Sequence, residues 1–110
     1  MYRSKIIGMG YSVPENIISN DDLSKIMDTS DNWIQSRSGI KERRWASNDV
    51  STSDLALEAS RAAIKNSKIN PSDIDMIIVG TLSPDYFFPG VGAQLQEKLN
   101  LKTIAAFDIK

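Results

Sequence analysis

Apolar residues recur along this chain in short segments that are separated by polar turns. Apolar periods near two or near 3.6 residues predict strands and helices, respectively. On this basis the sequence predicts a short strand at the start of residues 5–14, helices within 19–28 and 28–39, an extended segment at 40–46, a long helix within 51–69, a strand at 76–79, a helix at 91–100 and a strand at 103–110. The order strand, helix, strand, helix, strand of the clearest elements is typical of an α/β fold with a parallel sheet.

Polar residues mark the ends of the predicted helices. Asn20 is expected to cap the helix within 19–28. Thr29 or Ser30 is expected to begin the next helix, and Gly39 to end it.

The helix within 51–69 has the clearest signals. Ser51 and Asp54 have the spacing of a capping box, with Asp in place of the usual Glu. Its apolar face is thin and rich in alanine, at Ala59, Ala62 and Ala63. Because alanine side chains are short, we expect another stretch of backbone to approach this face closely.

The predicted sheet lacks cover on one face. Residues 76–79 and 104–107 are mostly apolar, which is typical of strands that are buried on both faces. Right-handed crossovers place the two long helices on the same face, so the other face stays bare. We therefore expect this chain to be part of a larger protein.

Composition narrows the function without identifying it. The chain has 110 residues and a formal net charge of -1, so no overall field attracts nucleic acid or an anionic membrane. No apolar run predicts a signal peptide or a membrane span. Cysteine and histidine are absent, which leaves no disulfide, thiol nucleophile or imidazole base and argues against a metal site. The lack of cysteine fits a cytoplasmic protein.

The segment DNWIQSRSGIKERRW contains the first candidate binding site. In a helix, Trp33 and Arg37 lie one turn apart on the same face. An indole beside a guanidinium can stack on a flat heteroaromatic ring and bind a nearby phosphate. Residues 37–44 carry a local charge of +3, from four cations less one anion, which suits a phosphorylated ligand. Alternatively, Trp33 packs its helix down and the cations form a solvated face.

The segment SPDYFFPG contains the second candidate site. Tyr86, Phe87 and Phe88 precede a proline turn. These aromatic residues either anchor the loop against the core or line an apolar pocket, and spacing leaves both interpretations open.

Four segments together carry a resemblance to a known family. DTSDNWIQSRSGIKERRW, LALEASRAAI, IDMIIVGTLSPDYFFPG and the final AFDIK resemble the N-terminal third of β-ketoacyl-acyl-carrier-protein synthase III, the condensing enzyme that starts bacterial fatty-acid synthesis. The most specific part is the pattern D-T-S-D-x-W-I-x-x-R-(S/T)-G-I-x-E-R. The resemblance implies a thiolase-like αβαβα sandwich, of which residues 1–110 form the N-terminal part of the first half-domain, with no second domain in this chain.

The resemblance implies a mechanism whose catalytic residues are absent from this chain. The family's cysteine, histidine and asparagine are expected after Lys110, with the cysteine within roughly ten residues, at the start of a helix. An acyl group passes from a coenzyme A thioester to the cysteine, malonyl-acyl carrier protein loses carbon dioxide, and the resulting carbanion attacks the acyl-enzyme. The whole protein is thus expected to be an acyltransferase and a homodimer without a permanently bound cofactor. This chain alone is expected to be inactive.

Four residues match substrate-binding positions of the family. Thr29, Trp33 and Arg37 match residues that hold the nucleotide of coenzyme A, with Trp33 stacking on adenine. Phe88 matches the phenylalanine that reaches across the dimer to line the acyl pocket of the other subunit.

Alternatives to this assignment stay open at the level of the sequence. The chain can instead be a non-catalytic interaction or structural fragment. Condensing enzymes that make polyketides, alkylquinolones or long-chain olefins share much of the pattern, and hydroxymethylglutaryl-CoA synthase is a more distant candidate. The residues do not determine the preferred length of the acyl chain.

Overall fold

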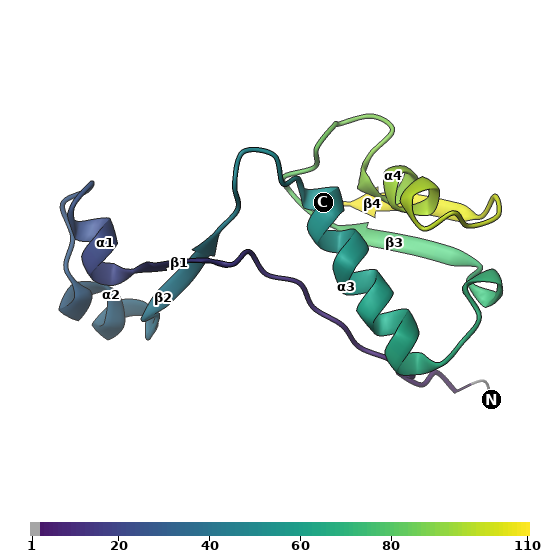
Figure 1. Ribbon diagram of the computed structural model, residues 1–110, viewed down its shortest axis with the longest axis horizontal. Helices are drawn as coiled ribbons and strands as arrows, with labels where there is room; N and C mark the ends of the chain where they lie inside the picture. The colour runs from purple at the N-terminus through teal and green to yellow at the C-terminus, as the bar shows by residue number, and fades with distance from the viewer. Residues whose placement is uncertain (1–2) are drawn as a thin grey trace. The chain divides into compact units, whose positions relative to one another are not determined.

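The computed structural model describes residues 3–110, which form two compact units (Figure 1). The smaller unit is Val13–Asp49, and the larger unit consists of residues 3–12 together with 50–110. Each unit contains one two-stranded sheet and helices. Over residues 3–110, no helix combines the length and the apolar character that crossing a membrane requires.

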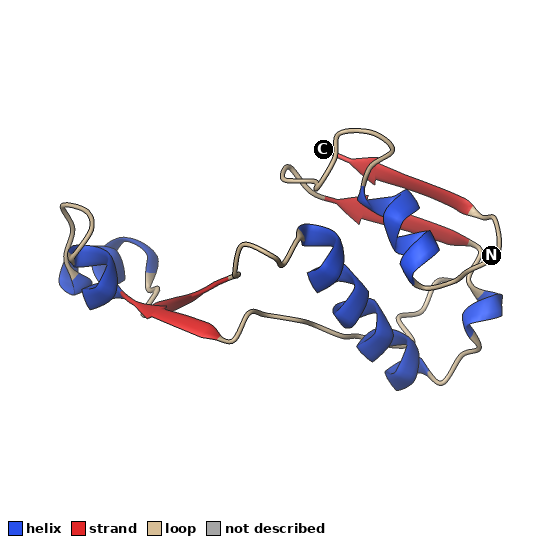
Figure 2. Cartoon of the chain, turned by 45° about the horizontal axis from the view of Figure 1, so that its top comes forward, coloured by secondary structure: helices blue, strands red, loops and turns tan. Residues whose placement is uncertain are grey.

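The smaller unit is a β-ribbon with two short helices at one end (Figures 1 and 2). Its elements are β1 (Asn16–Ser19), α1 (Asn20–Ser24), α2 (Asp31–Ser38) and β2 (Glu42–Trp45). The two strands are antiparallel, with Asn16 opposite Trp45 and Ser19 opposite Glu42. This register brings the start of α1 close to the chain that leaves α2. The extended segment predicted at 40–46 is confirmed by β2.

Helix α1 is shorter than predicted, and a different residue caps it. Ser19 is the N-cap: its Oγ accepts a hydrogen bond from the backbone N–H of Asp22 at 3.1 Å, and the Asp22 carboxylate accepts one from the backbone N–H of Ser19 at 3.1 Å. The prediction that Asn20 caps this helix is therefore wrong. Asn20 is instead only 1% exposed and faces the interior of the unit. A serine hydroxyl caps as well as an asparagine amide, which leaves Asn20 available for another role.

The larger unit contains a parallel pair of strands, two α-helices and a short 3-10 helix. Its elements are α3 (Thr52–Ser67), the short 3-10 helix η1 (Pro71–Asp73), β3 (Met76–Gly80), α4 (Val91–Lys98) and β4 (Ala105–Ile109). Strands β3 and β4 are parallel, with Met76 opposite Ala105 and Gly80 opposite Ile109. The capping box predicted for α3 is present. The parallel pairing of these two strands confirms the predicted α/β class.

The strand predicted at the start of residues 5–14 is absent. Residues 3–10 have no regular structure and lie along α3. A Cβ atom on Gly8 would lie 2.5 Å from the carbonyl oxygen of Ala63, and one on Gly10 would collide with the carbonyl of Ala59. The close approach that the alanine face of this helix predicts is thus confirmed.

One face of the parallel pair is covered and the other is exposed. The core on the covered side consists of Ile77, Val91 and Leu95, with α4 packed on both strands and α3 against α4. The uncovered face consists of large apolar side chains that are each about half exposed: Met76, Ile78, Phe107 and Ile109. Burial of both faces stays a prediction for the larger protein. The bare face expected from the crossover rule is confirmed.

Candidate functional site

Helix α2, which carries two of the predicted binding residues, has well-defined ends. The Ser30 Oγ accepts a hydrogen bond from the backbone N–H of Trp33 at 3.2 Å, so Ser30 rather than Thr29 is the N-cap. Gly39 ends the helix with φ of 71°, a left-handed conformation that glycine adopts without strain. Its N–H donates to the carbonyl of Gln35 at 2.8 Å. The predicted helix is confirmed with both of its ends.

Trp33 and Arg37 form the central pair of the candidate site. They lie one turn apart on α2, and the Arg37 Cζ is 5.6 Å from the centroid of the Trp33 ring. This separation is within the range of a cation–π interaction. Trp33 is nevertheless 57% exposed, so it does not pack the helix down. The pair presents a flat aromatic ring with a fixed positive charge beside it.

A buried amide fixes α2 to the ribbon. The Asn20 Nδ2 donates to the carboxylate of Asp31 and to the carbonyl of Ile40, each at 2.8 Å. Its Oδ1 accepts a hydrogen bond from the guanidinium of Arg43 at 2.5 Å. Asp31 is the first residue of α2, and Ile40 follows its end. The single Asn20 side chain therefore holds both ends of the helix, and its own donors and acceptor are satisfied.

The carboxylate of Asp31 strengthens this attachment. A hydrogen bond from Asn20, and to a smaller extent those from Gln35, hold the pKa of Asp31 below its ordinary value. Burial opposes this shift. The positive charge of Lys41 lowers the pKa slightly further. Asp31 is thus ionised at neutral pH. A negative charge in the first turn of a helix also interacts favourably with the helix dipole.

Part of the predicted positive patch is used to hold the ribbon together. Arg43 binds the buried amide described above and a carbonyl of β1. Arg44 donates to the carbonyls of Pro14 and Glu15 at 3.2 and 3.3 Å. These two cations are structural in this unit. Arg37 remains as the cation beside the exposed indole.

Thr29 precedes the cap of α2 and has an unpaired hydroxyl. Its Oγ1 is buried and has no hydrogen-bond partner among residues 3–110. A buried hydroxyl without a partner costs free energy. The structure thus brings Trp33 and Arg37 together on α2, and Thr29 lies just before the start of this helix.

Phe88 lies in the larger unit, on the loop between β3 and α4. It is 89% exposed, and the preceding Tyr86 and Phe87 are 67% and 82% exposed. The Phe88–Pro89 peptide bond is cis. The interpretation in which these aromatic residues anchor the loop against the core is wrong for this chain, because all three point away from it.

Two residues that support these sites were missed in the sequence. Asn20 was interpreted as a helix cap, although Ser19 and Asp22 have the same capping-box spacing as Ser51 and Asp54. That spacing was the signal that would have assigned the cap correctly. Asp85 lies in a loop and accepts hydrogen bonds from the backbone N–H of Ser53, and no spacing in the sequence indicates this partner. Residues 3–110 hold no group of three or more side chains arranged to bind a metal ion.

Comparison with known proteins points to one class. No family model matches the chain. It is 57% identical over 104 residues to the β-ketoacyl-(acyl-carrier-protein) synthase III of Fusobacterium nucleatum subsp. nucleatum, covering 94% of this chain and 32% of that protein. The crystal structure of 3-oxoacyl-(acyl-carrier-protein) synthase III from Aquifex aeolicus VF5 is similar with a TM-score of 0.90 and 43% identity, covering 96% of this chain and 34% of that one. The priming β-ketosynthase of the R1128 polyketide pathway has a TM-score of 0.90 at 27% identity, covering 96% and 31%.

These similarities confirm the fold class and the family resemblance. The chain has the α/β fold of part of a thiolase-like protein. It is similar, over nearly its whole length, to β-ketoacyl-acyl-carrier-protein synthases III. It spans about a third of the length of these relatives.

Proposed function

We propose that this chain is the N-terminal part of a β-ketoacyl-acyl-carrier-protein synthase III, the condensing enzyme that initiates fatty-acid synthesis. The proposal is supported by the similarity to proteins of that name over 94% of the chain. The uncovered apolar face of the parallel strands fits a first half-domain that the rest of a thiolase-like protein covers. The single observation in the geometry that carries the proposal is the exposed pair of Trp33 and Arg37 on α2.

In the proposed function this pair binds the nucleotide of coenzyme A. The indole of Trp33 stacks on adenine, and the guanidinium of Arg37 binds a phosphate beside it. Thr29, which precedes the N-cap of the same helix, belongs to this site in the proposal. The attachment of α2 by Asn20 keeps the pair in place before the ligand arrives, which reduces the entropic cost of binding.

The reaction itself requires groups that this chain does not contain. Its sequence has no cysteine and no histidine. We place the catalytic cysteine, histidine and asparagine after Lys110. The cysteine thiolate attacks the acyl-CoA thioester and releases coenzyme A as a thiol. Malonyl-acyl carrier protein then loses carbon dioxide, and the carbanion left at its C2 attacks the acyl carbon. The bond to cysteine breaks, and 3-oxoacyl-acyl carrier protein is released.

The remaining parts of the proposal concern assembly and location. We place Phe88 in the wall of the acyl pocket, contributed across a homodimer, and its 89% exposure in the single chain supports such a role. Acyl-CoA and malonyl-acyl carrier protein are the partners, the cytoplasm is the location, and no permanently bound cofactor or metal takes part.

A priming enzyme of polyketide synthesis is the second candidate, because such an enzyme matches with a TM-score of 0.90 at 27% identity. Its chemistry is the same, and the two differ in the acyl group and the carrier protein that they accept. A third outcome is that the chain is a non-catalytic fragment. Incubation of this chain alone with acetyl-CoA is expected to give no thioester adduct by mass spectrometry, because no thiol is present.

The test uses the complete gene product with acetyl-CoA and malonyl-acyl carrier protein. The expected results are an acetyl-cysteine within roughly ten residues of Lys110 and 3-oxoacyl-acyl carrier protein as the product, both detected by mass spectrometry. Product formation only with a polyketide carrier protein would favour the second candidate. Absence of both the acyl-enzyme and the condensed product would contradict the assignment as a condensing enzyme.

A further inference from the structure

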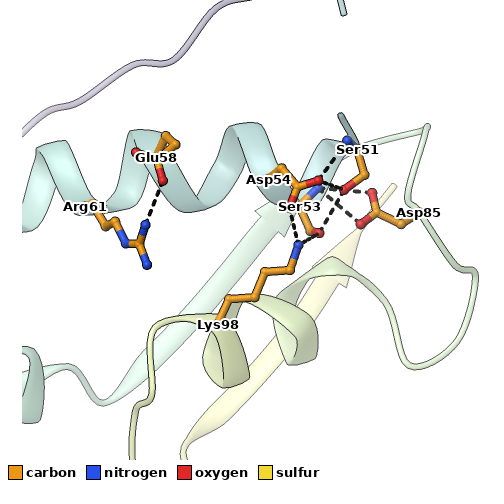
Figure 3. A network of polar contacts seen from close by, with 7 residues as sticks. All are labelled: Ser51, Ser53, Asp54, Glu58, Arg61, Asp85 and Lys98. Carbon is orange, nitrogen blue, oxygen red and sulfur yellow. Dashed lines mark hydrogen bonds and ion pairs between the residues drawn. The ribbon is translucent and has the colours of Figure 1, made fainter. Parts of the chain in front are cut away.

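The loop between β3 and α4 combines an exposed aromatic tip with a firmly attached base. Tyr86, Phe87 and Phe88 are the exposed residues, and the acidic residue before them, Asp85, lies at the start of α3 (Figure 3). The Nζ of Lys110 lies 4.6 Å from the centroid of the Phe87 ring, and beyond this contact the exposed rings have little packing to fix the conformation of the loop. The attachments at its base therefore determine where the aromatic tip lies.

Asp85 makes the first attachment. Its two carboxylate oxygens accept hydrogen bonds from the backbone N–H of Ser53 at 3.1 and 3.3 Å. Ser53 is in the first turn of α3, where backbone N–H groups have no partner within the helix, and it is fully buried. Beside it, the Oγ1 of Thr52 donates to the carbonyl of Ser83 at 2.7 Å. Two residues of the loop are thus tied to the first turn of one long helix.

A lysine of α4 completes the polar network around this attachment. The Lys98 Nζ donates to the Ser53 Oγ at 2.7 Å and to the Asp54 carboxylate at 2.5 Å (Figure 3). Burial raises the pKa of Asp85. Hydrogen bonds from the side chain and backbone of Ser53 outweigh this effect, Ser51 and Lys98 add smaller effects, and the pKa lies below its ordinary value. Asp85 is therefore a charged acceptor at neutral pH, and hydrogen bonds to charged acceptors are the stronger kind.

A second carboxylate attaches the other end of the loop. Asp108 on β4 accepts hydrogen bonds from the backbone N–H of Val91 at 2.8 Å and of Gly92 at 2.7 Å. Gly90 precedes them with φ of 94°, and a Cβ atom there would meet the same carboxylate. The aromatic tip is thus held between two aspartates, Asp85 on one side and Asp108 on the other.

We propose that Asp85 is a positioning residue that sets acyl-chain selectivity by holding Phe88 at a fixed place in the wall of the acyl pocket. This inference rests on the proposed function, in which Phe88 lines that pocket. Asp85 is separated from Phe88 by only two residues and reaches a rigid helix, so loss of its hydrogen bonds frees the aromatic tip directly. A freer ring excludes long or bulky acyl groups less strictly. Selectivity between acyl groups, rather than the rate with the best one, is therefore the property that Asp85 controls.

The test measures kcat/KM of the complete enzyme for acetyl-, butyryl-, hexanoyl- and octanoyl-CoA with malonyl-acyl carrier protein. In Asp85→Ala, the ratio between the best and the poorest thioester is expected to fall by about fivefold or more. Asp85→Asn keeps one acceptor oxygen, and its ratio is expected to lie between those of wild type and Asp85→Ala. Thr52→Val removes the adjacent bond to the loop without changing charge and is expected to shift the ratio in the same direction by less. Asp75→Asn, a change at an exposed aspartate paired with Lys102, is the matched control and is expected to leave the ratio unchanged.

A double-mutant cycle with Phe88→Ala separates positioning from general destabilisation. If Asp85 acts through Phe88, adding Asp85→Ala to Phe88→Ala changes the ratio no further. Hydrogen exchange of the amides at 82–90 is expected to become faster in Asp85→Ala and in Thr52→Val. An equal loss of kcat/KM for all four thioesters, or a shift of full size in the Phe88→Ala background, would overturn the proposal. Failure of the proposed function gives a different result, because wild type then forms no 3-oxoacyl product from any thioester.

Discussion

The two units hold their candidate binding residues in different ways. In the larger unit the apolar core consists of Ile77, Val91 and Leu95, each at most 9% exposed, and the buried polar residue Ser53 lies at the start of α3. In the smaller unit the one residue of comparable burial among those described is polar, Asn20 at 1% exposure. Trp33 is therefore positioned by hydrogen bonds around a buried polar side chain. The loop of the larger unit is also attached by hydrogen bonds, but to elements that an apolar core holds together.

The stability of the two units should therefore respond differently to substitutions. An apolar core gains stability in proportion to buried area and tolerates substitutions of similar volume. A buried polar hub depends on geometry, because a donor or acceptor left without a partner costs its full desolvation energy. The larger unit should thus be sensitive to side-chain volume, and the smaller unit to the identity of single polar groups.

The largest expected effect is on the apolar core of the larger unit. Leu95→Ala in the complete protein should lower the free energy of unfolding by about 2–5 kcal/mol, because it removes a nearly buried side chain from between α4 and the strands. Denaturant unfolding measures this loss. Leu82→Ala, at a residue that is 84% exposed, is the matched control and should cost less than about 0.5 kcal/mol. Equal losses for the two variants would show that α4 does not form the core of this unit.

The next effect concerns the polar hub of the smaller unit. Asn20→Ala leaves Asp31 and Arg43 without their shared partner and should cost about 1–3 kcal/mol. Hydrogen exchange should become faster in α2 and stay unchanged in α3. Asn32→Ala, at an exposed asparagine of α2, is the control and should change neither the free energy of unfolding nor the hydrogen exchange of α2. Unchanged protection of α2 in Asn20→Ala would refute the role of the hub.

The smallest expected effect is a dependence on pH that both units share. Hydrogen bonds from Lys98 and Ser51 hold the pKa of Asp54 well below its ordinary value of 3.8. Hydrogen bonds from Lys25 and Ser19 lower the pKa of Asp22 in the same way. Since folding lowers these pKa values, their contribution to stability is fully present above about pH 4 and is lost as pH falls further.

Unfolding midpoints measured between pH 2 and 7 test this dependence. Asp54→Asn and Asp22→Asn should each lower stability at pH 7 and flatten the decline in acid. The effects should be modest because both carboxylates face solvent and are screened. Parallel pH profiles for wild type and both variants would contradict the assigned interactions.

The elements that were predicted correctly are those whose signals are local. The capping box at Ser51 and Asp54 marks the start of α3, and Gly39 marks the end of α2. Apolar runs located β3 and β4. The pattern of Trp33 and Arg37 on one helical face was also visible, because one helical turn determines it.

The elements that were missed depend on partners far away in the sequence. Strand β1 has only four residues and is defined by pairing with β2, which lies beyond two helices. Residues 5–14 predict a short strand that runs into a turn at Gly8 and Gly10, but this segment lies against the alanine face of α3. Asn20 and Asp85 bind groups 11 to 32 residues away. No periodicity in the sequence reports such contacts.

The central claim is that Trp33 and Arg37 bind the nucleotide of coenzyme A, and one kinetic comparison tests it most directly. The KM of the complete enzyme is measured for acetyl-CoA and for acetyl-pantetheine, which lacks the nucleotide, in wild type, Trp33→Ala, Arg37→Ala and Arg37→Lys. Trp45→Ala, at a half-exposed tryptophan of the same unit, is the matched control.

Loss of an aromatic stack or of a phosphate contact typically costs about 1–3 kcal/mol. Trp33→Ala and Arg37→Ala are therefore expected to raise the KM for acetyl-CoA by roughly ten- to a hundredfold and to leave the KM for acetyl-pantetheine unchanged. Arg37→Lys should restore binding only in part, because an ammonium lacks the planar fork of a guanidinium. Trp45→Ala should affect neither thioester. Equal losses with both thioesters, together with a lower melting temperature, would contradict the claim and make Trp33 and Arg37 structural residues.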